Sequence, residues 1–449
     1  MTKKLLINAF NMNSVGHINH GLWAHPRDQS HKYKTLDYWT SLAKTLERGL
    51  FDGIFLADIV GVYDVYQGSA DLTLWESIQL PVNDPLLLIS AMAAVTRHLG
   101  FGVTVNVNGE PPYLFARRMS TLDHLSGGRL GWNIVTGYLD SAARAVGQDA
   151  QAEHDSRYER ADEYLEVLYK LWESSWSDEA VLLDKQGRRY ADPNRVRPVV
   201  HDGRYYKASG YHLAEPSPQR TPVLYQAGTS GRGKEFAAKH AECVFITAVD
   251  KAAARKTARA IREGAVSAGR NADDVKIFVG ITVITGATRS AAQDLYEEYL
   301  SYANPEAGLA HFSAGTGIDL SRFGLDEPIS YGTSNSIQSV TQLAQEKRWT
   351  KRQLLEELKM GGRYPLIVGD GESVASEMIS WMDEGEIDGF NLTRTVVPES
   401  YEDFVDHVVP RLQERGRYKT AYADGTLRKK LFGAGDRLPD RHFARSFAI

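Results

Sequence analysis

The sequence is poor in cysteine and has no excess of positive charge. Its single cysteine, Cys243, excludes intrachain disulfides and cysteine-based zinc or iron–sulfur sites in a chain of 449 residues. The 52 basic residues are balanced by 57 acidic ones, for a net charge of −5, so no basic surface for nucleic acid or an anionic membrane is expected. With 43% hydrophobic residues, the composition is that of a globular protein.

Long apolar runs are missing as well. The longest lies around residues 85–95 and is too short to span a bilayer. The amino-terminal stretch is interrupted by Asn8 and Asn11 and has no Ala-x-Ala ending, so no signal peptide is expected. These absences predict a cytoplasmic protein that binds neither nucleic acid nor membrane.

What the sequence does contain is a regular alternation of apolar strands and amphipathic helices. Most strands are continuous apolar runs, typical of parallel strands covered on both faces. The eight expected strands are Lys4–Phe10, Asp52–Ala57, Phe101–Val107, Arg129–Thr136, Pro222–Ala227, Val244–Ala248, Lys276–Thr285 and Asp388–Arg394. Helical spacing fills the gaps, at residues 35–49, 87–95, 114–125, 161–172, 236–240, 252–268, 291–302 and 374–383. The alternation predicts a (β/α)8 TIM barrel, with an open doubly wound sheet as the alternative fold.

The remaining length is expected to form insertions in one barrel domain spanning residues 1–449. Segments 11–34, 59–83, 137–157 and 303–365 follow strands, and 177–220 lies between the fourth helix and the fifth strand. Active sites of such barrels lie at the carboxyl ends of the strands, so these insertions are predicted to select the substrate. A C-terminal extension, 398–449, is expected to wrap the barrel or a partner subunit.

A glycine-rich loop follows the fifth strand. Residues 226–233 read Gln-Ala-Gly-Thr-Ser-Gly-Arg-Gly, which provides backbone N–H groups and hydroxyls at a helix amino terminus and so suits a phosphate. The alternative is a flexible turn in which Ser230 only caps the helix. The Gly-x-Gly-x-x-Gly spacing of a dinucleotide site is absent. In the run 153–158, His154 and Tyr158 lie one helical turn apart and are candidates for the same phosphate.

Polar residues also end other strands. Asp58, Asn106, Asn108, Asn133 and Thr136 are placed to face a ligand over the barrel mouth, although each is also a common turn or cap residue. Four histidines, at positions 17, 20, 25 and 31, raise the possibility of a metal. Their irregular spacing and a single nearby carboxylate favour hydrogen-bonded or solvated histidines, so no metal is predicted.

Several of these stretches resemble the bacterial-luciferase-like flavin monooxygenases, in the branch of the nitrilotriacetate and dibenzothiophene sulfone enzymes. The similarity covers nearly the whole chain and is greatest to the long-chain alkane and dimethyl sulfide monooxygenases. The matching segments are 8–10, 55–58, 62–66, 116–129, 132–136, 153–158, 215–222, 226–228 and 388–390.

This resemblance implies an FMN-binding TIM barrel whose flavin is reduced by a separate NAD(P)H:flavin reductase. Oxygen would react at the flavin C4a to give a peroxide or hydroperoxide that oxidises a small organic substrate. The resemblance also implies a set of FMN-binding residues, namely Asp58, Asn106, Asn108, Gly137, His154, Tyr158, Gly228, Thr229 and Ser230. It places His17, Tyr63, Gln79, Tyr138 and His311 in the substrate pocket, with His17 or His311 as the acid or base. We expect a homodimer or homotetramer.

Three departures from the family pattern make an alkane substrate doubtful. Ser14 stands where the alkane enzyme has cysteine, and Tyr138 where it has histidine. Asn106, Asn108 and Gly109 replace hydroxyl residues and an aromatic ring, which predicts space for a larger, flatter substrate. An FMN-dependent riboflavin lyase, with a second flavin as substrate, is therefore the alternative within the family. A sugar-phosphate lyase or isomerase and a non-catalytic flavin-storing protein remain alternatives outside it.

Overall fold

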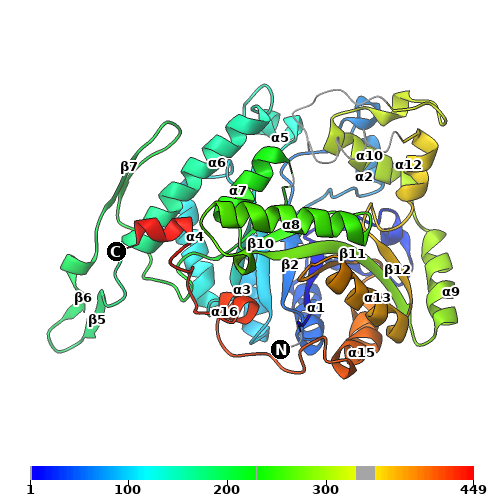
Figure 1. Ribbon diagram of the computed structural model, residues 1–449. Coiled ribbons are helices and arrows are strands. Elements are labelled where there is room, and N and C mark those ends of the chain that lie inside the picture. Colours follow the sequence, from blue (N-terminus) through cyan, green and yellow to red (C-terminus); the bar gives the residue numbers. More distant parts are fainter. Residues whose placement is uncertain (1–2, 229, 330–348, 449) are drawn as a thin grey trace.

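The core of the protein is a closed barrel of eight parallel strands (Figure 1). The computed structural model describes residues 3–228, 230–329 and 349–448. Around the barrel the strands are β1 (Leu6–Met12), β2 (Gly53–Ala57), β3 (Gly100–Asn106), β4 (Leu130–Val135), β9 (Val223–Gln226), β10 (Cys243–Ile246), β11 (Lys276–Gly286) and β13 (Gly389–Thr393). Pairing of β10 with β11 and of β13 with β1 closes the ring. The predicted TIM barrel is thus confirmed, and the open sheet is excluded.

The interior of the barrel is filled by aromatic side chains. Phe10 packs edge-on against Phe245 at 5.0 Å between ring centroids, and Phe55 packs likewise against Tyr225 at 5.5 Å. Neighbouring strands carry glycine where these rings need space: a Cβ on Gly102 would approach Phe55 to 3.2 Å. The barrel is therefore a packed core, and a ligand has to bind at one of its ends.

Helices cover the outside of the barrel, as their apolar stripes predict. In α1, for example, Trp39, Leu42 and Leu46 are buried, and Gly49 ends the helix. The covering helices are α1 (Leu36–Arg48), α3 (Leu86–Val95), α4 (Pro112–Leu125), α6 (His154–Tyr169), α7 (Gly231–His240), α8 (Lys251–Ser267), α9 (Arg289–Leu300), α13 (Gly371–Glu384) and α15 (Val409–Glu414). None of the helices among the described residues is both long and apolar enough to cross a membrane.

Several short elements inside the insertions were not predicted. Strand β12 (Leu366–Asp370) pairs with the carboxyl half of β11. Two hairpins, β5 (Val181–Asp184) with β6 (Arg189–Ala191) and β7 (Val199–Asp202) with β8 (Lys207–Gly210), extend away from the barrel (Figure 1). These strands are short and largely exposed, so they lack the apolar runs that identify the barrel strands.

Two insertions form a layer of their own. The helices α2 (Asp71–Trp75), α10 (Pro305–Thr316) and α12 (Lys351–Glu357) gather in one region in Figure 1. A second hydrophobic core joins them, in which Tyr63, Ile78 and Phe312 are buried. Insertions far apart in the sequence thereby hold each other in place, and they carry most of the predicted substrate-pocket residues.

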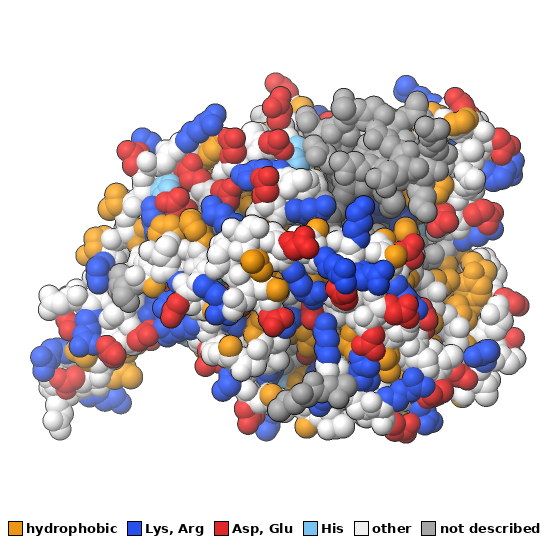
Figure 2. Space-filling model, viewed as in Figure 1, with side chains coloured by type: hydrophobic (Ala, Val, Ile, Leu, Met, Phe, Trp, Pro, Cys, Tyr) orange, Lys and Arg blue, Asp and Glu red, His pale blue; other side chains and the backbone are white. Residues whose placement is uncertain are grey.

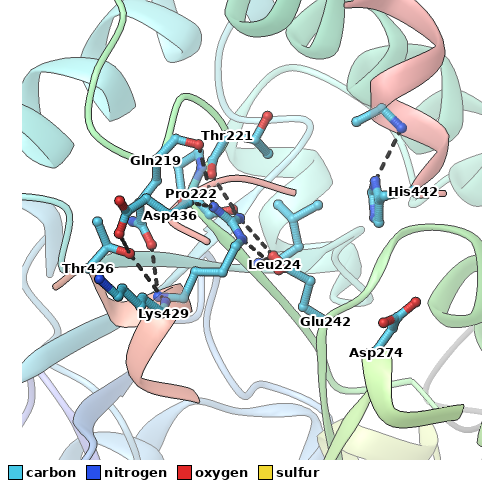
Figure 3. Close-up of polar contacts among 12 residues, drawn as sticks. Gln219, Thr221, Pro222, Leu224, Glu242, Asp274, Thr426, Lys429, Asp436 and His442 are labelled. Atoms are coloured by element: carbon cyan, nitrogen blue, oxygen red, sulfur yellow. Dashed lines mark hydrogen bonds and ion pairs between the residues drawn. The ribbon is translucent and has the colours of Figure 1, made fainter. Parts of the chain in front are cut away.

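The C-terminal extension is fastened to the amino ends of the strands by Arg428, which lies in α16 (Leu427–Phe432). Its guanidinium pairs with both carboxylate oxygens of Glu242, at 2.7 and 2.8 Å, and both side chains are buried (Figure 3). It also donates to the carbonyls of Thr221, Pro222 and Asp436. The extension therefore wraps the barrel, one of the two placements expected for it.

Candidate active site

The predicted phosphate-binding residues meet at the amino terminus of α7. The helix begins there because Ser230 caps it, its Oγ accepting from the Gly233 N–H at 3.0 Å. His154, in the first turn of α6, brings Nε2 to 3.4 Å from the same oxygen, and its ring lies 5.2 Å from that of Tyr158. We call His154, Tyr158, Gln226, Gly228 and Ser230 the phosphate cradle. Thr229 lies outside the described residues.

Two features of the cradle fit a phosphorylated, hydroxylated ligand such as FMN. A Cβ on Gly228 would approach the Tyr158 hydroxyl to 2.7 Å and would collide with the Gln226 amide, so this position needs glycine. The Gln226 Oε1 is buried and has no hydrogen-bond partner among the described residues, which leaves an acceptor available for a ligand hydroxyl. The N–H groups of α7 and the positive end of its dipole suit a phosphate.

The ends of β3 and β4 are locked to each other at the barrel mouth. Asn106 Oδ1 accepts from the Asn108 N–H at 2.9 Å, and Asn108 Nδ2 donates to the Thr136 carbonyl at 3.1 Å. Gly137 has φ +73°, and a Cβ there would approach Asn106 Nδ2 to 2.6 Å. Both asparagines therefore hydrogen-bond within this turn, and the Asn108 side chain is exposed. Asn106 stays half-buried beside Gly137.

Space opens beside this turn, as the missing aromatic ring predicts. A Cβ on Gly109 would meet only the Asn106 carbonyl, at 3.2 Å. The glycine lines a cavity of about 170 Å³ together with Val60, Asn106, Gln151 and Arg160. The volume is comparable to that of an aromatic side chain.

Three of the predicted substrate-pocket residues, Tyr63, Gln79 and Tyr138, are linked by hydrogen bonds, and a fourth, His311, joins them by ring stacking. The Tyr63 hydroxyl donates to Gln79 Oε1 at 2.7 Å and lies 3.3 Å from the Tyr138 hydroxyl. The Tyr63 ring stacks on His311 at 5.0 Å, and His311 Nδ1 lies 3.1 Å from His20 Nε2. We call Tyr63, Gln79, Tyr138, His311 and His20 the neutral cluster. His20, considered from sequence only as a metal ligand, is its unexpected member.

His17 lies close to the neutral cluster without a hydrogen bond to it among the described residues. Its ring packs against Phe10 at 4.6 Å, and its buried Nδ1 has no hydrogen-bond partner there. Burial lowers the pKa of His17 well below its usual value, and the positive charge of Arg394 acts in the same direction. The Arg394 guanidinium donates to the carbonyls of Ser14 and Val15 and so fixes the backbone just before His17.

Burial removes the charge from the whole cluster. It lowers the pKa of His20 to about 4 and that of His311 well below 6.5, so both imidazoles are neutral at pH 7. It raises the pKa of the Tyr63 and Tyr138 phenols, which keep their protons. Asp58 differs in that burial and the nearby Asp84 carboxylate raise its pKa to about 7, so that it titrates near neutrality.

Sequence reasoning also missed Arg363, which lies in the loop before β12. Its guanidinium carbon lies 5.2 Å from the centre of the Phe312 ring, next to His311 in α10. Its charge acts on the pKa of both Tyr138 and His311. No sequence signal distinguishes this arginine from the others in the chain, except the Gly361-Gly362 pair before it.

Other cavities of the described structure contain none of the predicted site residues. A larger cavity, of about 800 Å³, lies at the opposite end of the barrel and contains none of the predicted site residues. Most of its charged groups pair with each other, as Arg428 does with Glu242 and Arg441 with Asp274. Within the described residues, no cluster of three or more histidine, cysteine or acidic side chains could hold a metal ion. Figure 2 shows positive and negative side chains interspersed over one face.

Comparisons with known proteins agree with the family resemblance found in the sequence. Residues 18–385 match the family model of luciferase-like monooxygenases. The chain is 50% identical over 452 residues to the dimethyl-sulfide monooxygenase of Hyphomicrobium sulfonivorans, covering 100% of this chain and 94% of that protein. It is 50% identical over 449 residues to the long-chain alkane monooxygenase of Geobacillus thermodenitrificans, covering 100% and 98%.

Solved structures agree with these sequence relatives. A crystal structure of long-chain alkane monooxygenase superposes with a TM-score of 0.93 at 50% identity, and 100% of both chains is covered. A riboflavin lyase, solved with modified FMN and the substrate riboflavin, superposes with a TM-score of 0.94 at 36% identity, again covering 100% of both chains.

Proposed function

The chain belongs to the luciferase-like monooxygenase family, and from this premise we propose that it is a two-component, FMN-dependent monooxygenase of a small organic substrate. The observation that carries the proposal is the presence of two different polar groups over one barrel mouth. The phosphate cradle follows β9, and Tyr138 of the neutral cluster follows β4, the strand that pairs with β9. One group suits a charged cofactor and the other an uncharged reaction pocket.

In this proposal the cradle holds the FMN phosphate and the barrel mouth holds the ring. Ser230, His154, Tyr158 and the first N–H groups of α7 would bind the phosphate, with Gly228 and Thr229 giving the backbone access. Gln226 and Gly137 lie where they would meet the ribityl chain. Asp58, Asn106 and Asn108 would line the edge of the isoalloxazine ring.

Bound reduced FMN supplies the activation of oxygen, which no side chain of this site provides. The chain's own residues would keep water away and position the substrate. Tyr63 holds its phenolic proton against Gln79 Oε1, and the neutral imidazoles of His17 and His311 offer ring nitrogens for a proton. Because their pKa values are lowered by burial, these histidines would act at neutral pH as hydrogen-bonding groups and bases.

We further propose that a separate NAD(P)H:flavin reductase supplies the reduced FMN. The absence of a Gly-x-Gly-x-x-Gly unit after a strand in this sequence supports this division. The working form would be a cytoplasmic homodimer or homotetramer, for which the exposed Trp75, Leu87 and Leu125 offer apolar surface.

The test is an FMN titration of the purified full-length chain, followed by oxygen consumption with and without a flavin reductase. We expect FMN binding, negligible NADH or NADPH oxidation by the chain alone, and substrate-dependent oxygen uptake once reductase is present. Failure to bind FMN would favour a sugar-phosphate enzyme that uses the cradle for its substrate. FMN binding without any reaction of the reduced complex with oxygen would favour a flavin-storing protein. Rapid NADH turnover by the chain alone would contradict the two-component assignment.

A riboflavin lyase is the second candidate, and the cavity at Gly109 favours it. That cavity lies beside the barrel mouth, where it would admit part of a second flavin ring, and Asn106 and Gln151 line it. The similarity to the riboflavin lyase over 100% of both chains supports the same possibility. Incubation with riboflavin, reduced FMN and oxygen, followed by product analysis, separates the two: cleavage of riboflavin would establish the lyase.

A further inference from the structure

Arg363 acts electrostatically on the neutral cluster, and no acidic side chain among the described residues pairs with it. Within residues 3–228, 230–329 and 349–448 the Arg363 side chain makes no ion pair or hydrogen bond. Its guanidinium makes a cation–π contact with the Phe312 ring, at 5.2 Å. Part of its side chain is accessible, yet desolvation lowers its pKa.

Other buried arginines of this protein donate hydrogen bonds to acceptors in the structure. Arg129 donates to the hydroxyl of Thr96 and to four carbonyls, including that of Leu99. Arg394 donates to two carbonyls, and Arg428 pairs with Glu242. Since removing a charge from water costs several kcal/mol when it is not paired, an arginine without acceptors calls for a reason other than stability.

The backbone at Arg363 is strained in addition. Its φ is +81°, and Gly361 and Gly362 before it have φ +85° and +54°. These three consecutive left-handed residues pack against the 17–20 segment. The Gly361 N–H donates to Asn19 Oδ1 at 2.7 Å. Gly362 lies so close to Ile18 that a Cβ on it would approach Ile18 to 2.6 Å. A left-handed arginine costs about 1–2 kcal/mol, and such strain clusters at functional sites.

We propose that Arg363 binds an anionic group of the organic substrate, a carboxylate or a sulfonate, and holds it against the neutral cluster; this inference rests on the proposed function. The guanidinium lies against the ring of Phe312, which follows His311 in α10, so the anchored substrate would extend towards His311, Tyr63 and Gln79. A bidentate guanidinium–carboxylate pair in a water-poor pocket gives both affinity and orientation. Such a substrate would be negatively charged, unlike the dimethyl sulfide and the long-chain alkanes for which the two relatives at 50% identity are named.

The phosphate of FMN is not the anion that this geometry favours. The cradle at α7 already offers Ser230, His154 and a helix amino terminus, and within the described residues Arg363 makes no hydrogen bond, ion pair or cation–π contact with the cradle. The ring it contacts, Phe312, and the two groups whose pKa its charge affects, Tyr138 and His311, belong instead to the side where the substrate is placed.

The experiment compares matched anionic and neutral ligands on the full-length chain saturated with FMN. Isothermal titration calorimetry would measure octanoate against 1-octanol, benzoate against benzyl alcohol, and riboflavin as a larger neutral probe. The variants are Arg363→Met and Arg363→Gln, which remove the charge, and Arg363→Lys, which keeps it. Arg322→Met is the matched control, an exposed arginine of the same insertion that pairs with Asp319. All of these side chains carry a Cβ, so the left-handed backbone costs each variant at position 363 the same.

We expect the wild type to bind each carboxylate about tenfold to a hundredfold more tightly than its neutral partner. Arg363→Met and Arg363→Gln should abolish this preference, Arg363→Lys should keep part of it, and Arg322→Met should leave it intact. FMN affinity should be the same in all of them.

Equal binding of anionic and neutral ligands by the wild type would overturn the proposal, even if FMN binding and oxygen uptake are normal. Loss of FMN affinity in Arg363→Met and Arg363→Gln would do the same and would assign the arginine to the cofactor. Tight riboflavin binding that is indifferent to Arg363, with no carboxylate binding, would also overturn it. FMN affinity is measured separately on every variant. A failure to bind FMN, which would contradict the proposed function, is therefore distinguished from a loss of anion preference, which would contradict the role of Arg363.

Discussion

Burial sets the charge of almost every titratable side chain at the barrel mouth. His20 and His311 lie within hydrogen-bonding distance, and because desolvation lowers the pKa of both, the pair carries no repelling charges at pH 7. Tyr63 and Tyr138 keep their protons for the same reason. Against this neutral background the charge of Arg363 and the titrating carboxyl of Asp58 have an influence that they would not have at the surface.

The carboxyl group of Asp58 should make the stability of the protein depend on pH. Its pKa is about 7 in the folded chain against 3.8 for a free side chain, so the unfolded state ionises first. The contribution of Asp58 to the free energy of unfolding is therefore fully favourable below pH 4. It declines as the pH rises and is lost above pH 7. We therefore expect Asp58→Asn to be more stable than the wild type by roughly 2–4 kcal/mol at pH 8 and equal to it at pH 4. Urea unfolding at both pH values, without FMN, measures this difference.

Asp149→Asn is the matched control, because this aspartate is exposed. It should change stability little at either pH. A stability difference between wild type and Asp58→Asn that stays constant from pH 4 to pH 8 would contradict the assignment of a raised pKa to Asp58.

At the scale of elements, the apolar runs were enough to predict the barrel. Each of the eight predicted strands is present with ends within two residues of the prediction, because a strand buried on both faces has to be apolar throughout. Strand β12 escaped prediction because it is short, begins directly after the predicted 303–365 insertion, and pairs with the far half of β11 outside the ring of eight strands. The β5–β6 hairpin is exposed and mixed in polarity, so its sequence carries no strand period.

The site was predictable where its residues are local in sequence. His154 and Tyr158 lie one turn apart on α6, and Ser230 begins α7, so sequence spacing and the family resemblance led to the cradle. His20 and Arg363 reach the neutral cluster only through tertiary contacts between segments about 290 to 340 residues apart, such as that of Gly361 with Asn19. A sequence pattern within one segment cannot predict a contact with a residue that lies so far away along the chain.

In the proposed function, the cap of α7 would link helix stability to cofactor binding. Ser230→Ala removes the acceptor of the Gly233 N–H, which should lower the free energy of unfolding by about 1 kcal/mol. It also removes a hydroxyl from the phosphate site, and we expect FMN binding to weaken by roughly 1–2 kcal/mol. Fluorescence titration with FMN and thermal unfolding measure the two effects.

Thr288→Ala provides the control for the cap of α7. Thr288 caps α9, far along the chain from the cradle, and accepts from the Ala291 N–H. This variant should lose a similar amount of stability and keep its FMN affinity. An unchanged FMN dissociation constant for folded Ser230→Ala would remove the 226–233 loop from the cofactor site.

The turn after β3 offers a test of substrate size. Gly109 borders a cavity of about 170 Å³, and its φ is not in the left-handed region, so a large side chain can be placed there without backbone strain. Gly109→Phe or Gly109→Tyr should fill the cavity and abolish turnover of a large, flat substrate while FMN binding stays unchanged. The measurement is turnover of substrates of increasing size, with Gly109→Ala as the control that keeps the space. If Gly109→Phe handles every accepted substrate as well as the parent, the substrate lies elsewhere.

The whole molecule separates stability and chemistry between the two ends of the barrel. At the carboxyl ends of the strands, polar groups such as Gln226 Oε1 and His17 Nδ1 lack hydrogen-bond partners among the described residues. At the amino ends, Arg428 and Glu242 are buried and fully bonded, and together they tie α16 to the starts of β9 and β10 (Figure 3). This division is the one expected of a TIM barrel, where one rim carries function and the other carries stability.

Replacing Arg428 should therefore damage the fold and spare the site. Arg428→Met leaves the Glu242 carboxylate buried without its counter-ion, and we expect the free energy of unfolding to fall by about 3–5 kcal/mol. The double variant Arg428→Met with Glu242→Met should recover part of this loss, because the unpaired charge is gone. Arg437→Met, which breaks a partly exposed pair with Asp178, should cost about 0–1 kcal/mol. Urea unfolding gives these energies, and FMN titration of each folded variant should give the wild-type affinity. If Arg428→Met is no less stable than Arg437→Met, the pair does not fasten the extension; if it loses FMN affinity while folded, the two ends of the barrel are coupled rather than separate.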